Sequence, residues 1–194
     1  MNKLLIILAS TVVLFLIVQL LTSYRTSGIE TPQYKVLSVY DGFEIRQYDS
    51  MILAQTVINS NSYKKSASTG FRRVAGYIFG GNAQNKEISM TAPVFMAMGE
   101  STKMSFVMPK QYSLSDLPNP NSNNVQLMQI PPKKYAVLGF SGFASDKKIE
   151  IRIKKLKTLL EKHQIETKGE YTFLGYNSPW ELFGRRNEIA IELY

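Results

Sequence analysis

The predicted order of strands and helices repeats once along the chain, and this repeat restricts the fold more than any other feature. In each half, β-rich segments precede and follow one amphipathic helix; they cover residues 34–40, 43–48, 51–58, 88–98 and 103–108, then 125–130, 133–141, 171–176 and 188–193. Such a unit cannot bury its apolar face alone, so two copies are expected to share one core. The sequence therefore predicts an α+β domain of duplicated β-β-α-β-β units, whose pooled strands curl into a barrel-like sheet with a helix on each side.

The two helices are defined by apolar residues that recur at steps of three and four. In the first helix these residues are Tyr63, Ala67, Phe71, Val74 and Ile78, and in the second they are Ile149, Ile153, Leu156 and Leu160. Each set lies on one stripe of a helix, and the stripe must face an apolar partner. Asn61 or Ser62 is suited to cap the first helix and Ser145 the second, while Gly80-Gly81 supplies the left-handed residue that ends a helix.

The connections carry further signals. Asp41-Gly42 separates two β-rich segments and favours a type I′ hairpin turn. Residues 109–124, rich in Pro, Ser, Asn and Asp, are expected to form a long surface loop, which is either a lid or a tolerated insertion. Thr91-Ala92-Pro93-Val94 in the first half is echoed by Asn177-Ser178-Pro179-Trp180 in the second. We interpret this echo as another trace of the duplication.

The first 33 residues differ in character from the rest of the chain. Residues 4–21 form an apolar run broken only by Ser10, Thr11 and Gln19; as a helix it would be about 27 Å long, close to the hydrocarbon thickness of a bilayer. No small-x-small cleavage site follows, which favours an uncleaved transmembrane anchor at residues 1–23 over a cleaved signal peptide. Lys3 before the run favours a cytoplasmic N-terminus. We therefore expect a linker at residues 24–33 and a domain at residues 34–194 outside the cytoplasm, either periplasmic or extracellular.

The composition excludes several kinds of site. The chain has no cysteine, which rules out thiolate catalysis, zinc-thiolate sites and covalent c-type haem. Its one histidine, His163, falls at the end of the second helix, where we interpret it as favoured by the helix dipole rather than as an iron ligand. The net charge of +8 is spread along the chain without a run of five basic residues. We interpret it as a solvated surface and expect a monomer that binds no nucleic acid.

Basic residues beside aromatic ones are the best candidates for a binding site. Phe71 precedes Arg72-Arg73, and Trp180 and Phe183 precede Arg185-Arg186, so each half places apolar rings near guanidinium groups. A flat ligand could lie on the rings while its acid groups accepted paired hydrogen bonds from arginine. Ordinary core aromatics beside solvated arginines are the alternative interpretation.

Across its length the chain resembles the SOUL haem-binding proteins. The motifs that carry the resemblance are Phe43-Glu44-Ile45-Arg46 with Tyr48, Phe71 through Tyr77-Ile78-Phe79-Gly80-Gly81-Asn82, Ile88-Ser89-Met90-Thr91-Ala92-Pro93-Val94, Phe106-Val107-Met108-Pro109, Gly175-Tyr176-Asn177-Ser178-Pro179-Trp180 and Gly184-Arg185-Arg186-Asn187-Glu188. The resemblance implies a distorted eight-stranded barrel flanked by two helices and built by duplication, a fold shared with bacterial effector-binding domains. It also implies reversible, non-covalent binding of haem or a related tetrapyrrole in a shallow apolar cleft.

The same resemblance implies which residues form the binding site. The matching positions are Ser68, Phe71, Arg72 and Ala75 on the first helix and Trp180, Glu181 and Arg185 in the loop before the last strand. Related proteins place basic groups near two of these positions, whereas in this sequence Ser68 is neutral and Glu181 is acidic. Haem propionates would therefore have to pair with Arg72, Arg185 or Arg186, because an acid beside a propionate is unfavourable. The resemblance implies no particular axial ligand to the iron.

Three functions follow, in order of preference. The first is a membrane-tethered domain that binds haem or another planar tetrapyrrole and catalyses no reaction. The second is an effector-binding-like module for a different apolar ligand, a cation or a lipid, for which Glu181 would be the discriminating group. The third is hydrolysis of a small molecule with Glu181 as general acid or base, although no second catalytic group is evident near it.

Overall fold

The computed structural model describes residues 3–194, apart from the side chains of residues 4, 6, 16 and 20–27. Its helices are α1 (Lys3–Ser27), α2 (Tyr63–Ile78), α3 (Asp146–Lys162) and the short 3₁₀ turn η1 (Leu114–Asp116). Its strands are β1 (Tyr34–Tyr40), β2 (Phe43–Tyr48), β3 (Met51–Ile58), β4 (Val94–Met98), β5 (Thr102–Val107), β6 (Gln126–Ile130), β7 (Lys133–Ser141), β8 (Thr167–Gly175) and β9 (Arg186–Leu193). The chain is thus α+β, as predicted.

The strand order shows how the two units are combined. All strands belong to one antiparallel sheet in the order β1-β2-β7-β9-β8-β4-β5-β3-β6. Leaving β1 aside, the order is symmetric about the boundary between β8 and β4. The units are therefore β2-β3-α2-β4-β5 and β6-β7-α3-β8-β9, each giving its first strand to the sheet half of the other. The sheet has nine strands rather than eight, because the turn at Gly42 (φ +96°) folds β1 back onto β2 as an added edge.

Two short connections force this sheet to curl. β2 and β3 are separated by only Asp49 and Ser50, yet β2 lies near one end of the sheet order and β3 near the other. Pro131 and Pro132 join β6 to β7 in the same way. Because three residue steps span at most about 11 Å, the ends of the sheet must bend toward each other. The result is a curled half-barrel.

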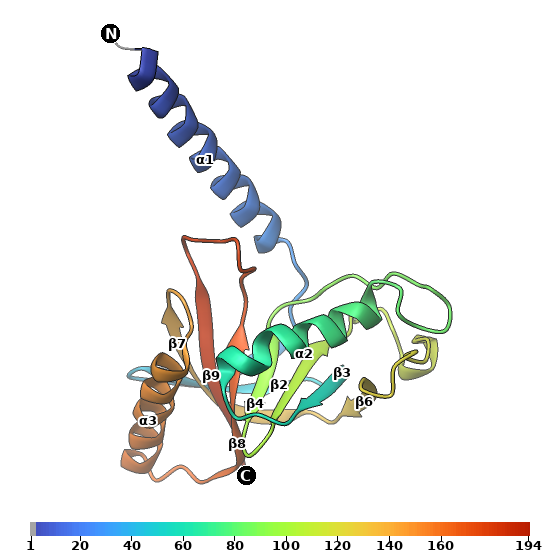
Figure 1. Cartoon of the computed structure of the whole chain (residues 1–194). Coiled ribbons are helices and arrows are strands. Elements are labelled where there is room, and N and C mark those ends of the chain that lie inside the picture. Colours follow the sequence, from blue (N-terminus) through green and yellow to red (C-terminus); the bar gives the residue numbers. More distant parts are fainter. Residues whose placement is uncertain (1–2) are drawn as a thin grey trace.

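The two faces of the sheet are buried by different means. α2 packs on β3 and β5, and α3 packs on β7 and β9 (Figure 1), which covers one face. No helix among the described elements packs on the other face, but its side chains are buried because the sheet curls around them. They are Tyr48, Met51, Leu53, Val107, Val137, Leu174 and Ala190.

Both long helices of the domain start and stop where the sequence predicts. The Ser62 side chain accepts a hydrogen bond from the Lys65 amide at the start of α2, and Ser145 accepts one from Lys148 at the start of α3. Gly80 follows α2 with φ of +100°, the left-handed conformation expected there. Asp146 of α3 also accepts hydrogen bonds from the backbone amides of Tyr63 (2.6 Å) and Lys64 (3.3 Å). One carboxylate therefore fixes the N-terminal ends of both helices together.

Three details of the sequence interpretation were wrong. The turn at Asp41-Gly42 is not of type I′, because Gly42 has a positive φ and Asp41 does not. The strand predicted at residues 88–98 begins only at Val94, because the Ile88 amide bonds to Ile78 and the Ala92 amide to Glu30 instead of to a neighbouring strand. The echo between residues 91–94 and 177–180 does not mark equivalent positions. The first segment precedes β4, whereas the second follows β8, its symmetry counterpart.

The apolar leader forms α1, which extends away from the sheet (Figure 1). Within the described residues, no helix is both long enough and apolar enough to cross a membrane. The transmembrane prediction for residues 1–23 is therefore not supported. Part of that prediction falls on residues 1–2 and on the side chains of residues 4, 6, 16 and 20–23, which lie outside the described part of the chain.

Candidate ligand-binding site

The loop between β8 and β9 contains three of the predicted site residues and is held by its own hydrogen bonds. The Glu181 carboxylate accepts hydrogen bonds from the side-chain amide of Asn177 (2.8 Å) and the backbone amide of Ser178 (2.9 Å). Glu181 is 2% exposed. It therefore stabilises the loop from inside and is not the accessible binding-site group that the sequence interpretation expected.

Arg185 closes the same loop. Its Nη1 atom donates to the carbonyl oxygens of Ser178 (2.8 Å) and Glu181 (2.6 Å), and its guanidinium lies 4.6 Å from the centre of the Phe143 ring. Its Nε atom is buried and has no hydrogen-bond partner among the described residues. Trp180, by contrast, points outward and is 76% exposed.

The predicted residues of α2 lie on different sides of the helix. Phe71 is 37% exposed and its ring contacts that of Phe106 in β5, with 5.3 Å between centroids. Ser68 and Arg72 are exposed, whereas Ala75 is buried. No hydrogen bond, ion pair or ring contact between these four side chains and the β8–β9 loop is found in the described residues. The loop instead contacts the segment before α3, where Arg185 lies on Phe143 (4.6 Å), and Asp146 at the start of α3 accepts a hydrogen bond from the Tyr63 amide at the start of α2.

A row of rings connects the N-terminal ends of the two helices. Tyr63 packs edge-on against Phe173 of β8 (5.1 Å between centroids), and Phe173 packs against Phe140 of β7 (6.3 Å). We call these three residues the ring row. Burial raises the pKa of Tyr63, and the nearby Arg185 charge acts in the opposite direction. The ring row is the apolar floor between the N-terminal ends of α2 and α3.

Arg152 of α3 is a site candidate that the sequence interpretation missed. Its guanidinium lies 5.7 Å from the centre of the Phe140 ring, at one end of the ring row. Like Arg185, it has a buried Nε atom without a hydrogen-bond partner in the described part of the chain. Buried donors without a partner are rare in folded proteins and usually mark a bound water, an ion or a functional site. The only sequence signal is its position in α3, beside the apolar stripe.

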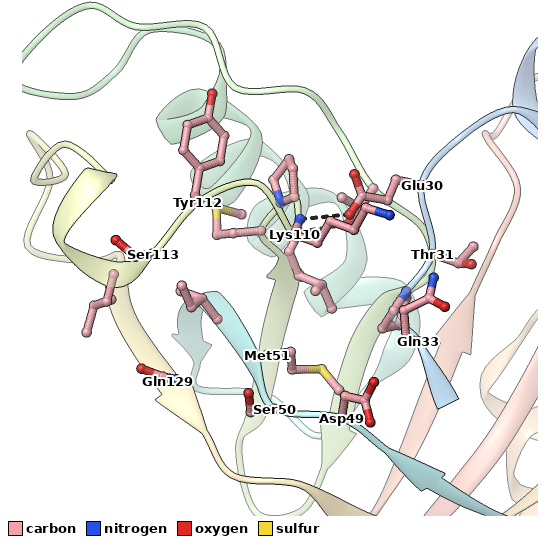
Figure 2. Close-up of a pocket in the computed structure, with 17 residues that line it drawn as sticks. Glu30, Thr31, Gln33, Asp49, Ser50, Met51, Lys110, Tyr112, Ser113 and Gln129 are labelled. Atoms are coloured by element: carbon pink, nitrogen blue, oxygen red, sulfur yellow. Dashed lines mark hydrogen bonds between the residues drawn. The ribbon is translucent and has the colours of Figure 1, made fainter. Parts of the chain in front are cut away.

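A cavity of about 300 Å³ lies elsewhere, where the linker before β1 meets the β2–β3 turn (Figure 2). The Lys110 amide donates to a Glu30 carboxylate oxygen (2.7 Å), and Asp49, Met51 and Tyr112 also line the cavity. None of the predicted site residues lines it. The predicted site is thus a surface between two helices, and this cavity is separate from it.

The face of the sheet on which no described helix packs, called here the helix-free face, carries a buried cluster of charged side chains. Glu188 is 2% exposed and accepts hydrogen bonds from Arg46 (3.0 and 3.2 Å), Arg186 (3.2 and 2.7 Å) and the Tyr176 hydroxyl (2.7 Å). Burial alone would raise the pKa of Glu188, but these donors outweigh it and hold the pKa below its usual value. Because this carboxylate is fully hydrogen-bonded within the protein, we interpret the cluster as structural.

The described residues offer no metal site of the usual kind. No three of their His, Asp and Glu side chains are grouped so as to hold a metal ion. His163 follows the end of α3 and packs against Tyr40 (4.8 Å between centroids) and Phe43 (5.9 Å), not against the predicted site residues. An axial ligand for haem iron therefore remains unassigned, as in the sequence interpretation.

The fold and sequence have clear relatives. Human heme-binding protein 2 is 30% identical over 175 residues, covering 84% of this chain and 85% of its own, and the mouse protein of that name is 29% identical over the same shares. Among solved structures, the EcmrR C-terminal domain is similar in fold, with a TM-score of 0.63 at 9% identity, covering 83% of this chain and 98% of that domain. The family model described as SOUL heme-binding protein matches residues 29–192. This chain is a member of the SOUL haem-binding protein family.

Proposed function

We propose that this protein binds haem or a related tetrapyrrole non-covalently, at the surface between the β8–β9 loop and the N-terminal ends of α2 and α3. The observation that carries the proposal is the pair of buried guanidinium Nε atoms, in Arg152 and Arg185, that have no partner among the described residues. Both arginines lie against phenylalanine rings, Arg152 against Phe140 and Arg185 against Phe143. Family membership and the names of the relatives support the same ligand class.

The chemistry of this surface fits a flat ligand with two acid groups. Phe143 (54% exposed) and Trp180 (76%) offer ring faces to an apolar macrocycle. Rotation of the Phe143 ring would uncover the Arg185 guanidinium, which donates in a fixed fork that matches a carboxylate. When bound, haem would supply the apolar ring and two propionate groups. Arg152 and Arg185 would orient those groups, and the hydrogen bonds of Glu181 would keep the loop in place.

A hemin titration tests this proposal. The full chain in detergent micelles is titrated with hemin, with empty micelles as the blank, and the Soret band is followed to saturation. Because a charge-assisted hydrogen bond contributes about 1.5–3 kcal/mol, Arg152→Gln and Arg185→Gln should each weaken binding by about 10-fold or more. Arg73→Gln is the matched control, since Arg73 donates to the Val57 carbonyl (2.9 Å) and should leave the affinity unchanged.

A second ligand separates ring stacking from acid recognition. The dimethyl ester of the porphyrin has no free carboxylate, so it should bind the wild-type chain less tightly than hemin does. In the variant lacking both arginines, hemin and the ester should bind equally. A linear response to hemin that never saturates would rule out the proposal, and equal affinities in the wild type would rule out the role given to the arginines.

Two of the alternatives relied on an accessible Glu181: binding of a cation by an effector-binding-like module, and hydrolysis with Glu181 as general acid or base. Its carboxylate is buried and accepts hydrogen bonds from Asn177 and Ser178. A module for another apolar ligand or a lipid does not depend on Glu181 and remains an alternative. The absence of catalysis, the monomeric state and the absence of a nucleic-acid partner remain predictions.

We also propose that α1 attaches the domain to a membrane, with the domain on the side away from the cytoplasm. Large apolar side chains along the helix are exposed, among them Leu5 (59%), Leu8 (61%) and Leu14 (62%). They bury little area in this chain and would be covered by lipid. Flotation of the full chain with lipid vesicles after an alkaline wash tests attachment, and protease access in intact cells tests the side. Recovery in the soluble fraction would contradict this proposal.

A further inference from the structure

The tip of the β8–β9 loop presents three large apolar side chains to the outside. Trp180 is 76% exposed, Phe183 60% and Leu182 42%. Single exposed apolar residues are common on proteins, but a contiguous group on one loop usually marks a contact surface. We call these three residues the loop tip. Nothing in the proposed haem contacts requires Leu182 or Phe183 to point outward.

The loop tip is fastened to α1. The Gln19 side chain donates to the Trp180 carbonyl (3.3 Å) and accepts from the Leu182 amide (3.1 Å). Figure 1 shows the β8–β9 loop rising from the sheet toward the end of α1 that adjoins the domain. The contact explains why a polar side chain interrupts the apolar run of α1. It also fixes the height of the loop tip along that helix.

This height coincides with the end of the apolar run. Gln19 is two residues before the last apolar position of the run at residue 21. At 1.5 Å per residue, the Gln19 level is therefore only about 3 Å from the end of the run along the helix axis. If lipid covers the run, the loop tip lies at the boundary between hydrocarbon and head groups. Tryptophan is enriched at that boundary because its ring is apolar and its N–H group remains hydrogen-bonded.

The charge near the loop favours an anionic lipid surface. α2, whose first turn Asp146 joins to the segment that the loop contacts, carries Lys64, Lys65, Arg72 and Arg73 and no acidic residue. Lys64, Lys65 and Arg72 are exposed. Each basic residue near an anionic bilayer contributes attraction of about 1 kcal/mol. Asp146, an acid close to this turn, is engaged with the N-terminal amides of α2.

We infer that the loop tip is a lipid-contacting surface: Trp180, Leu182 and Phe183 insert into the interfacial layer of an anionic bilayer beside α1. The inference rests on the proposed membrane attachment of α1. It adds that the domain lies against the bilayer with its ligand site facing the lipid, because Trp180 belongs to both surfaces. A tetrapyrrole dissolved in the membrane would then reach the site without crossing water.

The chain offers a direct test, because Trp180 is its only tryptophan. The full chain, without hemin, is reconstituted into vesicles of phosphatidylcholine and phosphatidylglycerol, and flotation confirms attachment. The vesicles contain lipids brominated either close to the head group or at the chain end. We expect Trp180 emission to shift to shorter wavelength, to be quenched at least 2-fold by the bromines near the head group, and to be protected from aqueous iodide.

Variants assign the contact to the loop tip. Leu182→Ser and Phe183→Ser should each reduce quenching by brominated lipid, whereas Phe79→Ser should not. Phe79 is a matched control because it is 61% exposed and lies at the opposite end of α2, about 24 Å along the helix from Tyr63. Circular dichroism checks that each variant is folded.

Other results would overturn the inference. Floating vesicles in which Trp180 is open to iodide and insensitive to bromine would show that the loop stands clear of the lipid, while the attachment of α1 survives. Protection from iodide without bromine quenching would assign the loop tip to contact with a second copy of the chain. Failure to float would remove the attachment and this inference together. None of these outcomes bears on the hemin titration.

Discussion

Replacing Glu188 by glutamine tests whether the ionic cluster on the helix-free face stabilises the fold. The amide keeps the shape of the carboxylate but turns one acceptor oxygen into a donor. Oε1 accepts from three donors, and Oε2 accepts from Arg46 (3.0 Å) and the Tyr176 hydroxyl (2.7 Å). Even with the new NH₂ group at the Oε2 position, at least two donors lose their acceptor. Each buried donor without a partner costs about 1–3 kcal/mol.

The lost charge adds to this effect. The side chain of Arg46 is only 7% exposed, so Glu188→Gln leaves a buried cation with only the partly exposed Glu44 (2.8 Å) as its counterion. Arg186 is 48% exposed at its side chain and can be solvated instead. Removing one partner of a buried ion pair usually destabilises a protein by about 3–5 kcal/mol. Both arguments agree on a loss of about 3–5 kcal/mol in the free energy of unfolding.

Urea denaturation of the full chain in a mild detergent, followed by far-UV circular dichroism, measures this loss. Glu192→Gln is the matched control: Glu192 lies on the same strand and bonds to Lys133 (2.7 Å) and Lys168 (3.1 Å), but it is 19% exposed at its side chain. Partly solvated pairs contribute about 0–1 kcal/mol. If Glu188→Gln cost no more than the control, the cluster would be accessible to water and the argument from burial would be wrong.

Three further predictions concern stability. The pKa of Glu188 is lower in the folded chain than the ordinary value of about 4.3, so the unfolded chain binds more protons at acid pH. The free energy of unfolding should therefore fall as the pH drops below about 5. Urea titrations at several pH values should show a smaller decline for Glu188→Gln. Gly81→Ala should destabilise the protein by more than about 1 kcal/mol, because the added Cβ would lie 2.5 Å from the Gly76 carbonyl oxygen. At Gly76 an added Cβ meets no atom within 4 Å, so Gly76→Ala should stabilise α2 by up to about 1 kcal/mol. Thermal melts of the two variants test this difference. Asp146→Ala should lower the free energy of unfolding by about 1–2 kcal/mol, because the Tyr63 and Lys64 amides lose their capping acceptor. A loss no larger than that caused by replacing an exposed acid elsewhere would show that this cap does not stabilise the helices.

Much of the fold could be predicted because its signals are local. The cap at Ser62 and the left-handed Gly80 that follows α2 depend on residues within one or two turns of the helix. The β1–β2 hairpin depends on Gly42 alone for its positive φ. The duplication was readable because the same sequence of local signals occurs twice. Such features require no knowledge of what packs against them.

The exchange of strands between units could not be predicted in this way. β2 pairs with β7 of the other unit, and β6 pairs with β3. Alternation of apolar residues tells which face of a strand is buried but not which strand lies beside it. The edge position of β1 was hidden for the same reason, and the sheet was expected to have eight strands. The two-residue connections after Tyr48 and Ile130 were visible, but their meaning depends on a strand order that only the structure reveals.

At the candidate site, too, the features that depend on the fold could not be predicted from the sequence, and this affects which ligand is expected. The family resemblance implied that Glu181 belongs to the binding cleft, whereas the loop buries its carboxylate against Asn177 and Ser178. Sequence reasoning missed Arg152 because only the fold places Phe140 beneath it. Together these corrections remove the acid that would have opposed the predicted pairing of haem propionates with arginine. The acid is engaged inside the loop, and the buried donors without a partner among the described residues are the Nε atoms of Arg152 and Arg185. The surface should therefore select an anionic ligand over a cationic one of the same shape.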